Sequence, residues 1–529
     1  MHRGRGNWVV WVVLAVGCGL RLGLAAVMPA SLAYDDHFTP IRKIAREVRL
    51  PRPDECWECY QPPLYYVTSA SVFAGVEKIA LAVGAAAPTA EETGRKAVQF
   101  LSAIAGCATL LVCMRILRQV RSPSASGGRG KARPEAGNRS FAPEKNGIAA
   151  PAALGLAVAA VLPQHVYMSA MITNDAFTYL VASLAISAAL WARAAGWPVG
   201  RTLLTGALAG AAILSKGYGV VTAASILAVM CAAALVKLVL RSSSRGPAVR
   251  VSRAGAQRDR AADVRATEGA GPPDPRPVRA VLLVAAVVLA LGVWPSARNL
   301  ALYGRTHVDN FDFFRTAMQA QPPGSVAAID WTSFRIIGLL QRPWLHARHV
   351  DSFWTEVYAR YWFEYEGIVI SLRNSAEWSQ FRDRILRQTG RWNAEAWRAM
   401  LRWGAEDVPT DLRRVAVVSY IGGLPLTAFV LAGFVLSARR LTSFAWALLV
   451  VHFIACLFVP VFQTLRLPYF AAMKSAFTLS ALSSAPLFVA ECGHTLRGNL
   501  RRLGLVTGWS AAALVAAADA AYIVIQWRA

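Results

Sequence analysis

The segment WVVWVVLAVGCGLRLGLAAVM, residues 8–28, is an apolar run close to the start of the chain. About 20 apolar residues in a helix are needed to cross the hydrocarbon core of a membrane, so this run predicts a transmembrane helix. The basic stretch MHRGRGN before it gives the outline of a signal peptide. The run is longer than the roughly 7–15 residues of a signal-peptide core, however, and Arg21 interrupts it. We therefore expect an uncleaved anchor helix.

Similar apolar runs recur along all 529 residues, of which 55% are hydrophobic and only 16% are charged. A soluble domain has about 25% charged residues, so we predict an all-α polytopic membrane protein. The net charge of +25 does not indicate a nucleic-acid partner, because the cations lie in short loops between the runs and form no separate basic domain. We expect eleven spans, near 8–29, 96–118, 147–167, 174–194, 202–216, 218–240, 279–297, 413–437, 441–460, 468–490 and 503–526.

Loop charge decides how one further run, 64–84, is placed. The linkers 119–146 and 241–278 are rich in Arg, Ser, Gly and Pro, and basic loops face the cytoplasm in membrane proteins. If 64–84 crossed the membrane, the basic N-terminus and these linkers would lie on opposite sides. We therefore expect 64–84 to be a juxtamembrane helix along the outer interface, with the N-terminus inside.

The same topology divides the chain into three parts. Residues 1–297 form an N-terminal transmembrane catalytic module whose first outer loop is 30–95, and residues 413–529 form the C-terminal transmembrane helices. Between them, 298–412 carries fourteen Arg against thirteen Asp and Glu. Because this segment is long and its charges nearly balance, we predict a small extracytoplasmic domain there.

Polar residues of several loops meet at the outer face in this topology. They are Asp35, Asp36, His37, Glu58, Tyr60, Gln61, Asn174, Asp175, Lys216, Arg298, Arg466 and Lys474. Ionisable groups at the ends of spans are costly and by default face a cavity or a partner. Of two adjacent acids such as Asp35 and Asp36, one can act as a base while the other binds a metal or orients an acceptor. Cations at the lipid surface suit a phosphate.

Each candidate also has a purely structural alternative. Asp36 and His37 could be solvated loop residues. Asn174 and Asp175 could cap the helix that follows them. Lys216 could extend to the membrane interface, as long cationic side chains do. No single residue is decisive, and the hypothesis rests on the combination.

The combination resembles a known family. The segments that carry the resemblance are, in order, YDDHF (34–38), QPPLYY (61–66), PQHVYMSAMITNDAF (163–177), GALAGAAILSKGYG (206–219), PSARNLALYG (295–304) and MKSAFTLSA (473–481). They are similar to motifs of the glycosyltransferase C (GT-C) superfamily, most of all to its bacterial branch of protein mannosyltransferases and lipid A aminoarabinose transferases. The resemblance implies a GT-C-like bundle in the bacterial cytoplasmic membrane, with its active site facing outward. It also implies transfer of a sugar from a polyprenyl-phosphate donor to a glycan, lipid or protein acceptor by an inverting single displacement.

The resemblance further implies a role for the candidate residues. Asp35 or Asp36 would be the general base that deprotonates the acceptor, and would bind a divalent cation, Mg²⁺ or Mn²⁺, if one is used. The residues implied near the donor phosphate are Tyr60, Gln61, Lys216, Arg298 and Lys474, the cations among them stabilising the leaving group. Two departures from the family pattern remove charge. Gln61 stands where Lys is frequent, and Lys474-Ser475-Ala476-Phe477 stands in place of the family's "KARY"-like sequence, which loses an Arg and a Tyr hydroxyl.

Three questions stay open at this point. A transporter or lipid flippase would place its charges at the bilayer midplane, often at broken helices. An inactive GT-C-like scaffold would fit the motif departures. Finally, Cys56 and Cys59 form a lone C-x-x-C pair, which is weak evidence for zinc and is compatible with a disulfide or with free thiols.

Overall fold

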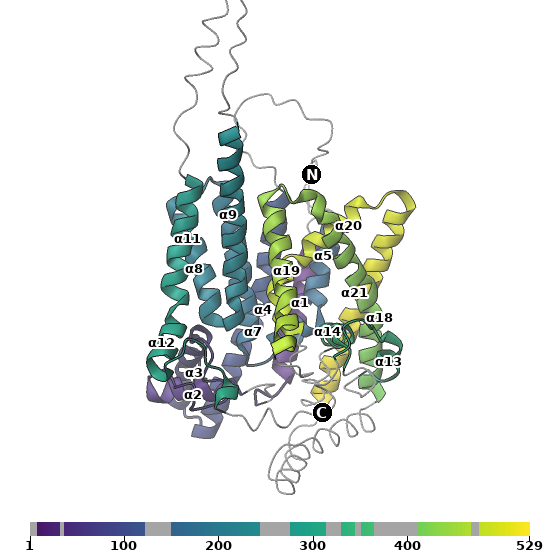
Figure 1. The fold of residues 1–529 in the computed structure, drawn as a ribbon. Helices are drawn as coiled ribbons and strands as arrows, with labels where there is room; N and C mark the ends of the chain where they lie inside the picture. The colour runs from purple at the N-terminus through teal and green to yellow at the C-terminus, as the bar shows by residue number, and fades with distance from the viewer. Residues whose placement is uncertain are drawn as a thin grey trace, which may run out of the picture.

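The computed structural model describes residues 8–31, 36–121, 150–243, 276–313, 329–343, 351–363, 410–466 and 475–528. Within these ranges every regular element is a helix, apart from one isolated bridge between Asp330 and Ser352, and there is no strand. The long helices form one bundle, with short helices gathered at its lower end (Figure 1).

Eight helical segments are long and apolar enough to cross a membrane. They comprise α1 (Trp8–Val27), α4 (Ala87–Arg121), α7 (Asn174–Ala194), η1 (Gly217–Gly219) with α9 (Val220–Ser243), α11 (Arg276–Gly292) with α12 (Trp294–Tyr303), α18 (Thr410–Ser437) with η4 (Ala438–Arg440), α19 (Phe444–Arg466) and α21 (Gly498–Arg528). Two bent pairs would each add a span: α5 (Ala150–Val161) with α6 (Pro163–Ser169), bent by 50°, and η6 (Ser475–Ser483) with α20 (Ala485–Thr495), bent by 66°. The described residues therefore form a polytopic bundle of eight to ten spans, where eleven were predicted. The remaining predicted span, 202–216, corresponds to the shorter apolar helix α8 (Val199–Ser215), which has 17 residues.

The two ends of the bundle carry different elements. In Figure 1, the short helices α2 (Phe38–Glu47) and α3 (Leu64–Ala82) lie at the lower end with α12, whereas α9 ends and α11 begins at the upper end. We call these the lower end and the upper end of the bundle. The linkers 119–146 and 241–278 lie almost entirely outside the described residues. Their cytoplasmic side therefore remains a prediction.

The run 64–84 is helical, but α3 is not among the segments that meet the requirements for a span. It packs against α2 and α4 at the lower end (Figure 1). Its inner face buries Tyr65, Tyr66 and Phe73. The tyrosines of QPPLYY therefore lie inside the protein, and the position of α3 along the membrane interface remains a prediction.

The bend between α5 and α6 explains why α1 contains a buried arginine. Pro163 has no N–H, so the carbonyl of Ala159 cannot receive the usual helical hydrogen bond. Arg21, which is fully buried, donates to this carbonyl at 3.2 Å and to the carbonyl of Ala160 at 2.8 Å. Its Nε also donates to Nδ1 of His165 at 3.1 Å. The guanidinium thus satisfies backbone groups that the bend leaves unpaired inside the membrane.

The segment 298–412 forms no separate domain in its described parts. Its helix α14 (Phe353–Trp362) packs against α18 within the bundle, and Phe353, Tyr358 and Trp362 are buried. At the point of contact α18 has Gly423, where a Cβ would collide with the Trp362 ring. The segment SFWTEVYARYW is helical, but its apolar face packs on the transmembrane helices instead of building the predicted separate domain.

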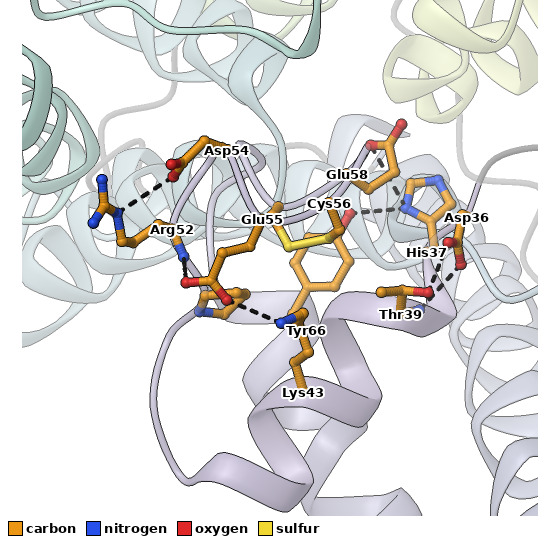
Figure 2. Close-up of a disulfide and its surroundings, with 12 residues drawn as sticks. Asp36, His37, Thr39, Lys43, Arg52, Asp54, Glu55, Cys56, Glu58 and Tyr66 are labelled. Atoms are coloured by element: carbon orange, nitrogen blue, oxygen red, sulfur yellow. Dashed lines mark hydrogen bonds and ion pairs between the residues drawn. A yellow bond between two sulfur atoms is a disulfide. The ribbon is translucent and has the colours of Figure 1, made fainter. Parts of the chain in front are cut away.

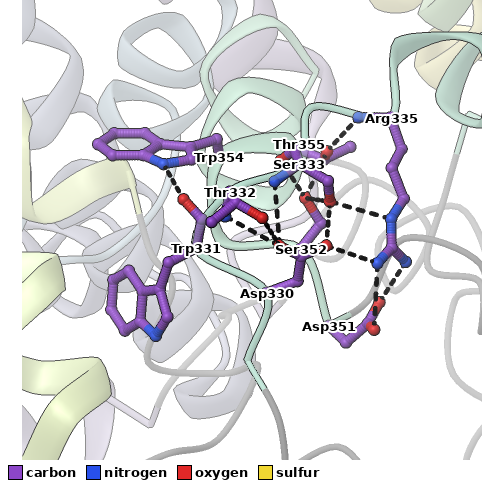
Figure 3. A network of polar contacts seen from close by, with 9 residues as sticks. All are labelled: Asp330, Trp331, Thr332, Ser333, Arg335, Asp351, Ser352, Trp354 and Thr355. Atoms are coloured by element: carbon purple, nitrogen blue, oxygen red, sulfur yellow. Dashed lines mark hydrogen bonds and ion pairs between the residues drawn. The ribbon is translucent and has the colours of Figure 1, made fainter.

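A polar network fixes the approach to α14 (Figure 3). Arg335, just before α13 (Ile336–Gln341), donates to Asp330 at 2.8 Å and to Asp351 at 2.7 Å. Hydrogen bonds from Ser333 and Thr332, then the one from Arg335, hold the pKa of Asp330 well below its usual range. The backbone N–H of Arg335 donates to Oγ1 of Thr355 in the first turn of α14. The network therefore joins the start of α13 to the start of α14.

Candidate functional site

His37 lies at the start of α2 and is almost completely buried. Its Nδ1 is 2.8 Å from the hydroxyl of Tyr66 on α3 and 3.9 Å from Oε2 of Glu58 (Figure 2). All three side chains come from the predicted first outer loop, 30–95, which contains α3. The tyrosine and the carboxylate together fix the orientation of the imidazole.

A disulfide between Cys56 and Cys59 shapes the turn that carries Glu58. The N–H of Cys59 donates to the carbonyl of Cys56 at 3.1 Å, closing the turn. Glu58 lies between the two cysteines in the chain, is 3% exposed, and points towards His37 (Figure 2). The sequence left open whether Cys56 and Cys59 form a disulfide or are free thiols, and the structure has the disulfide.

The same loop is anchored to α2 by Glu55. Its carboxylate accepts hydrogen bonds from Arg49 at 2.7 Å and from Lys43 at 3.0 Å (the Lys43 contact is drawn in Figure 2). The Arg49 guanidinium, with Lys43 and the N–H of Arg52, lowers the pKa of Glu55 to about 2. These charge-assisted contacts hold the disulfide turn over the helix.

Asp175 occupies the first turn of α7, where Thr173 is the N-cap residue. The Thr173 side chain accepts a hydrogen bond from the N–H of Asp175 at 3.2 Å, so the cap lies one residue before the Asn174–Asp175 pair that was expected to supply it. One carboxylate oxygen of Asp175 is 2.8 Å from Nζ of Lys216 and accepts from the hydroxyl of Tyr218 at 2.5 Å. The other accepts from the Thr173 hydroxyl at 2.9 Å.

The motif LSKGYG brings Lys216 to this position by ending α8 sharply. Lys216 itself is extended, and the short helix η1 then leads into α9. Gly219 approaches the last turn of α8 so closely that a Cβ would collide with the carbonyl of Ala212. The tight turn explains why a lysine and a tyrosine two positions apart can bind the same carboxylate.

The residues around His37 and the residues around Asp175 belong to one buried polar region, because α3 packs against the start of α7. The rings of Tyr65 and Phe177 are 5.9 Å apart. Burial raises the pKa of Tyr66 well above its ordinary value, and the negative charges of Glu58 and Asp175 raise it further. We call this set the polar cluster. It consists of His37, Glu58, Tyr66, Asp175, Lys216 and Tyr218.

The acidic pair of YDDHF is described only in part. Asp36 is exposed, and its carboxylate accepts from the N–H of Thr39 at 3.1 Å and from its hydroxyl at 2.6 Å, which stabilises the first turn of α2. Asp35 and Lys474 lie outside the described residues. The assignment of the base to either aspartate remains a prediction.

The other predicted residues lie around the polar cluster or apart from it. Gln61 donates to the hydroxyl of Tyr60 at 2.8 Å, and Asn174 donates to the carbonyl of Ser215 at 3.5 Å. Arg298 donates to the carbonyl of Pro51 at 2.7 Å. The structure therefore uses Arg298 to hold the first loop and gives it no contact with the cluster.

Arg466 belongs to a different contact at the end of α19. Its guanidinium donates to Asp309 at 2.9 Å and approaches His307 at 3.4 Å. The predicted cations thus divide into Lys216, which is inside the polar cluster, and two arginines that stabilise neighbouring loops.

Sequence analysis missed two members of the cluster and the arginine in the bundle. Tyr66 and Tyr218 stand inside the quoted motifs QPPLYY and LSKGYG, so their position was visible but their role was not. Arg21 was noted only as an interruption of the first run. The rule that charged residues within spans face partners could have identified it.

Among the described residues, no group of three or more His, Cys, Asp or Glu side chains is arranged to hold a metal ion. The described acids of the cluster instead have hydrogen-bond donors or a cation beside them. Binding of a divalent cation at Asp35 or Asp36 remains a prediction.

No protein-family model and no curated protein matches the chain. Solved structures of enzymes of the GT-C superfamily are similar to it. The apo oligosaccharyltransferase of Archaeoglobus fulgidus has a TM-score of 0.45 at 13% identity, covering 99% of this chain and 56% of that one. The same protein in complex with an inhibitory peptide and a dolichol-phosphate gives 0.45 at 14%, covering 98% and 55%. ArnT from Cupriavidus metallidurans bound to undecaprenyl phosphate gives 0.34 at 14%, covering 92% and 78%.

This chain therefore spans a little over half the length of the archaeal enzyme. The fold likeness is distant, and the low TM-scores add nothing about individual residues. A functional proposal has to stand on the side chains of this protein.

Proposed function

We propose that this protein is a membrane glycosyltransferase that transfers a sugar from a polyprenyl-phosphate donor to an acceptor at the lower end of the bundle. The observation that carries the proposal is the polar cluster, in which a lysine, two acids, a histidine and two tyrosines converge beside a juxtamembrane helix. Buried ionisable groups of this kind are expensive unless they serve a site. The lower end would face the outside of a bacterial cytoplasmic membrane.

The chemistry is a single displacement at the anomeric carbon. A carboxylate of the YDDHF segment, Asp35 or Asp36, removes the proton of the acceptor hydroxyl. At the same time the oxygen of the acceptor forms a bond to the anomeric carbon. The bond from that carbon to the phosphate oxygen breaks, and polyprenyl phosphate leaves with the electron pair. Lys216 stabilises the charge that develops on the phosphate.

The remaining members of the cluster hold these groups in position. Asp175 keeps the Lys216 ammonium at the lower end in the absence of a phosphate. His37 directly follows Asp36 in the chain, and its contacts with Tyr66 and Glu58 fix the backbone beside that aspartate. A base must lie within hydrogen-bond reach of the acceptor, so the positioning of this segment by His37 affects the rate of sugar transfer.

One observation favours the transporter alternative. Arg21 and His165 are buried at the bent helix pair α5–α6, and Asp519 of α21 is buried and acts electrostatically on Arg21. Charges at a broken helix are the feature expected of a transporter. The guanidinium, however, is bonded to backbone carbonyls that the bend requires it to satisfy, and this accounts for its presence without a transported substrate.

The test is a transfer assay with purified protein in lipid nanodiscs. A panel of polyprenyl-phosphate sugars is offered, and released polyprenyl phosphate is measured. We expect release from at least one donor, and loss of release in Lys216→Met but not in Arg466→Gln, which removes a cation outside the cluster. Absence of donor binding across the panel, combined with sugar or lipid flux in proteoliposomes, would favour the transporter instead.

A further inference from the structure

The upper end of the bundle has many cations and few acids among its described residues. They include Arg193 at the end of α7, Lys237 near the end of α9, Arg279 near the start of α11, and Arg501 and Arg502 near the start of α21. The acid of this end is Glu491, which is 2.8 Å from Arg440. Positive charge therefore exceeds negative charge among the described residues of this end.

Two of the cations line a shallow hollow between α7, α9, α11 and α19. Arg193 stands in the last turn of α7 and Lys237 near the end of α9. Trp197, Met230 and Phe444 supply an apolar lining. Cations above an apolar floor are suited to a molecule with an anionic head and a hydrocarbon body.

The tryptophan is held in the hollow by an unusual backbone. Trp197 has φ of 64°, a left-handed conformation that a bulky side chain rarely adopts. Its N–H donates to the carbonyl of Ala192 at 2.8 Å, closing the turn after α7. Its ring meets Phe444 edge-on, with centroids 5.6 Å apart. Such backbone strain tends to occur at binding sites, where it fixes a side chain in place.

The two cations have no carboxylate partner among the described residues. The guanidinium of Arg193 lies 5.9 Å from the Phe444 ring centre, and Lys237 is exposed. Below them, α9 and α11 present apolar side chains to the outside, with Leu235 61% and Leu282 64% exposed. A phosphate bound between the cations would therefore have lipid-facing helix surfaces beside it for acyl chains.

We propose that this hollow binds the headgroup phosphate of an anionic phospholipid from the membrane leaflet at the upper end. Arg193 and Lys237 contact the phosphate, Trp197 packs on the glycerol region, and the acyl chains lie along α9 and α11. Tryptophan is favoured at this depth of a bilayer. The site lies at the opposite end of the bundle from the polar cluster and is independent of the proposed transfer reaction.

The experiment measures lipid retention by the full chain. Protein purified in detergent is titrated with phosphatidylglycerol or phosphatidylcholine, and bound lipid is counted by native mass spectrometry. We expect selective retention of phosphatidylglycerol and about a tenfold weaker apparent affinity in Arg193→Gln/Lys237→Gln, which loses two charge-assisted contacts. Trp197→Ala should weaken retention of the same lipid.

The matched control is Arg501→Gln/Arg502→Gln, which removes the same charge from the same end but does not line the hollow. It should retain phosphatidylglycerol like the wild type. Equal loss in this control would show diffuse attraction, and equal retention of phosphatidylcholine would show no headgroup site; either result overturns the proposal. Displacement of the lipid by inorganic phosphate alone at equal concentration would also overturn it. Thermal unfolding without added lipid establishes that each variant is folded.

Discussion

At the lower end of the bundle, charges meet opposite charges or polar partners within the protein. Asp175 binds Lys216, Glu55 binds Arg49 and Lys43, and Arg466 binds Asp309. At the upper end, Arg193 and Lys237 have no carboxylate partner among the described residues. The lower end thus holds its charges in a fixed geometry within the protein, as the proposed transfer reaction requires, whereas these two cations are placed to bind the phospholipid proposed above.

The largest expected effect concerns the acids of YDDHF. Asp→Asn keeps the shape and removes the proton acceptor, so one of Asp35→Asn and Asp36→Asn should lose at least about a hundredfold in transfer rate. Asn at position 36 keeps one oxygen to accept from the N–H of Thr39, and its amide can donate to the Thr39 hydroxyl, so α2 should remain intact. Rates are measured in nanodiscs with donor binding as the control. Near-normal rates in both variants would mean that these acids only stabilise the loop.

The next effect concerns the ion pair of the polar cluster. Lys216→Met should slow transfer by roughly 10–150-fold, because a charge-assisted contact to the leaving phosphate contributes about 1.5–3 kcal/mol. Because the single change leaves Asp175 buried without its cation, stability should also fall. The double variant Asp175→Asn/Lys216→Met should recover melting temperature but not activity. Recovery of both would assign the pair a structural role alone.

A smaller effect is expected from the disulfide. Reduction by a dithiol opens the Cys56–Cys59 bond and releases the turn that holds Glu58 against His37. We expect a loss of about tenfold in rate, because the Glu58 carboxylate, 3.9 Å from Nδ1 of His37, would no longer be held beside the imidazole. Cys56→Ser/Cys59→Ser should show the same loss and no response to the dithiol.

The matching comparison is Glu58→Gln. If the disulfide acts through Glu58, the loss from Glu58→Gln and the loss from reduction should not add. Additive losses would separate the disulfide from the polar cluster.

A modest effect on stability should follow from Glu55. Its pKa in the folded protein, about 2, lies below the ordinary 4.5. The contacts therefore stabilise the first loop above pH 4.5, and this contribution disappears as the pH falls from 4.5 towards 2. Glu55→Gln should lower the free energy of unfolding by about 1 kcal/mol at pH 7, since the partners are largely solvated. Thermal melting of the wild type and of Glu55→Gln at pH 7 and near pH 2 checks this prediction. An equal loss of stability in the variant at both pH values would contradict it.

The smallest effect is expected at the upper end. Arg501→Gln removes an exposed cation, and its transfer rate and melting temperature should equal those of the wild type, within about 0.5 kcal/mol. A clear loss of activity would contradict the separation of the two ends, because it would connect the upper end to the transfer reaction.

The apolar runs predicted the helices well because burial in lipid imposes length and composition on each span. They could not predict the bend at Pro163 or the burial of Arg21, since the partners of that guanidinium are carbonyls of a distant helix. The motifs located Asp175 and Lys216 separately. Their pairing depends on the turn at Gly219, which no periodicity describes.

The helix α14 shows the same limit. Its sequence predicts a helix with one apolar face, and this is correct, but the pattern cannot tell whether that face covers a small domain or a transmembrane helix. Only the missing side chain at Gly423 gives room for Trp362 within the bundle. Local pattern determines the element, and long-range fit determines its place.

The arginine of the first helix and the proline of the fifth-to-sixth bend act as one unit. Arg21 supplies to Ala159 the hydrogen that a proline amide lacks, so each residue makes the other tolerable in lipid. A homologue with an ordinary residue in place of Pro163 would have a continuous helix and would no longer need the cation. The two positions should therefore change together in evolution, although they are far apart in the chain.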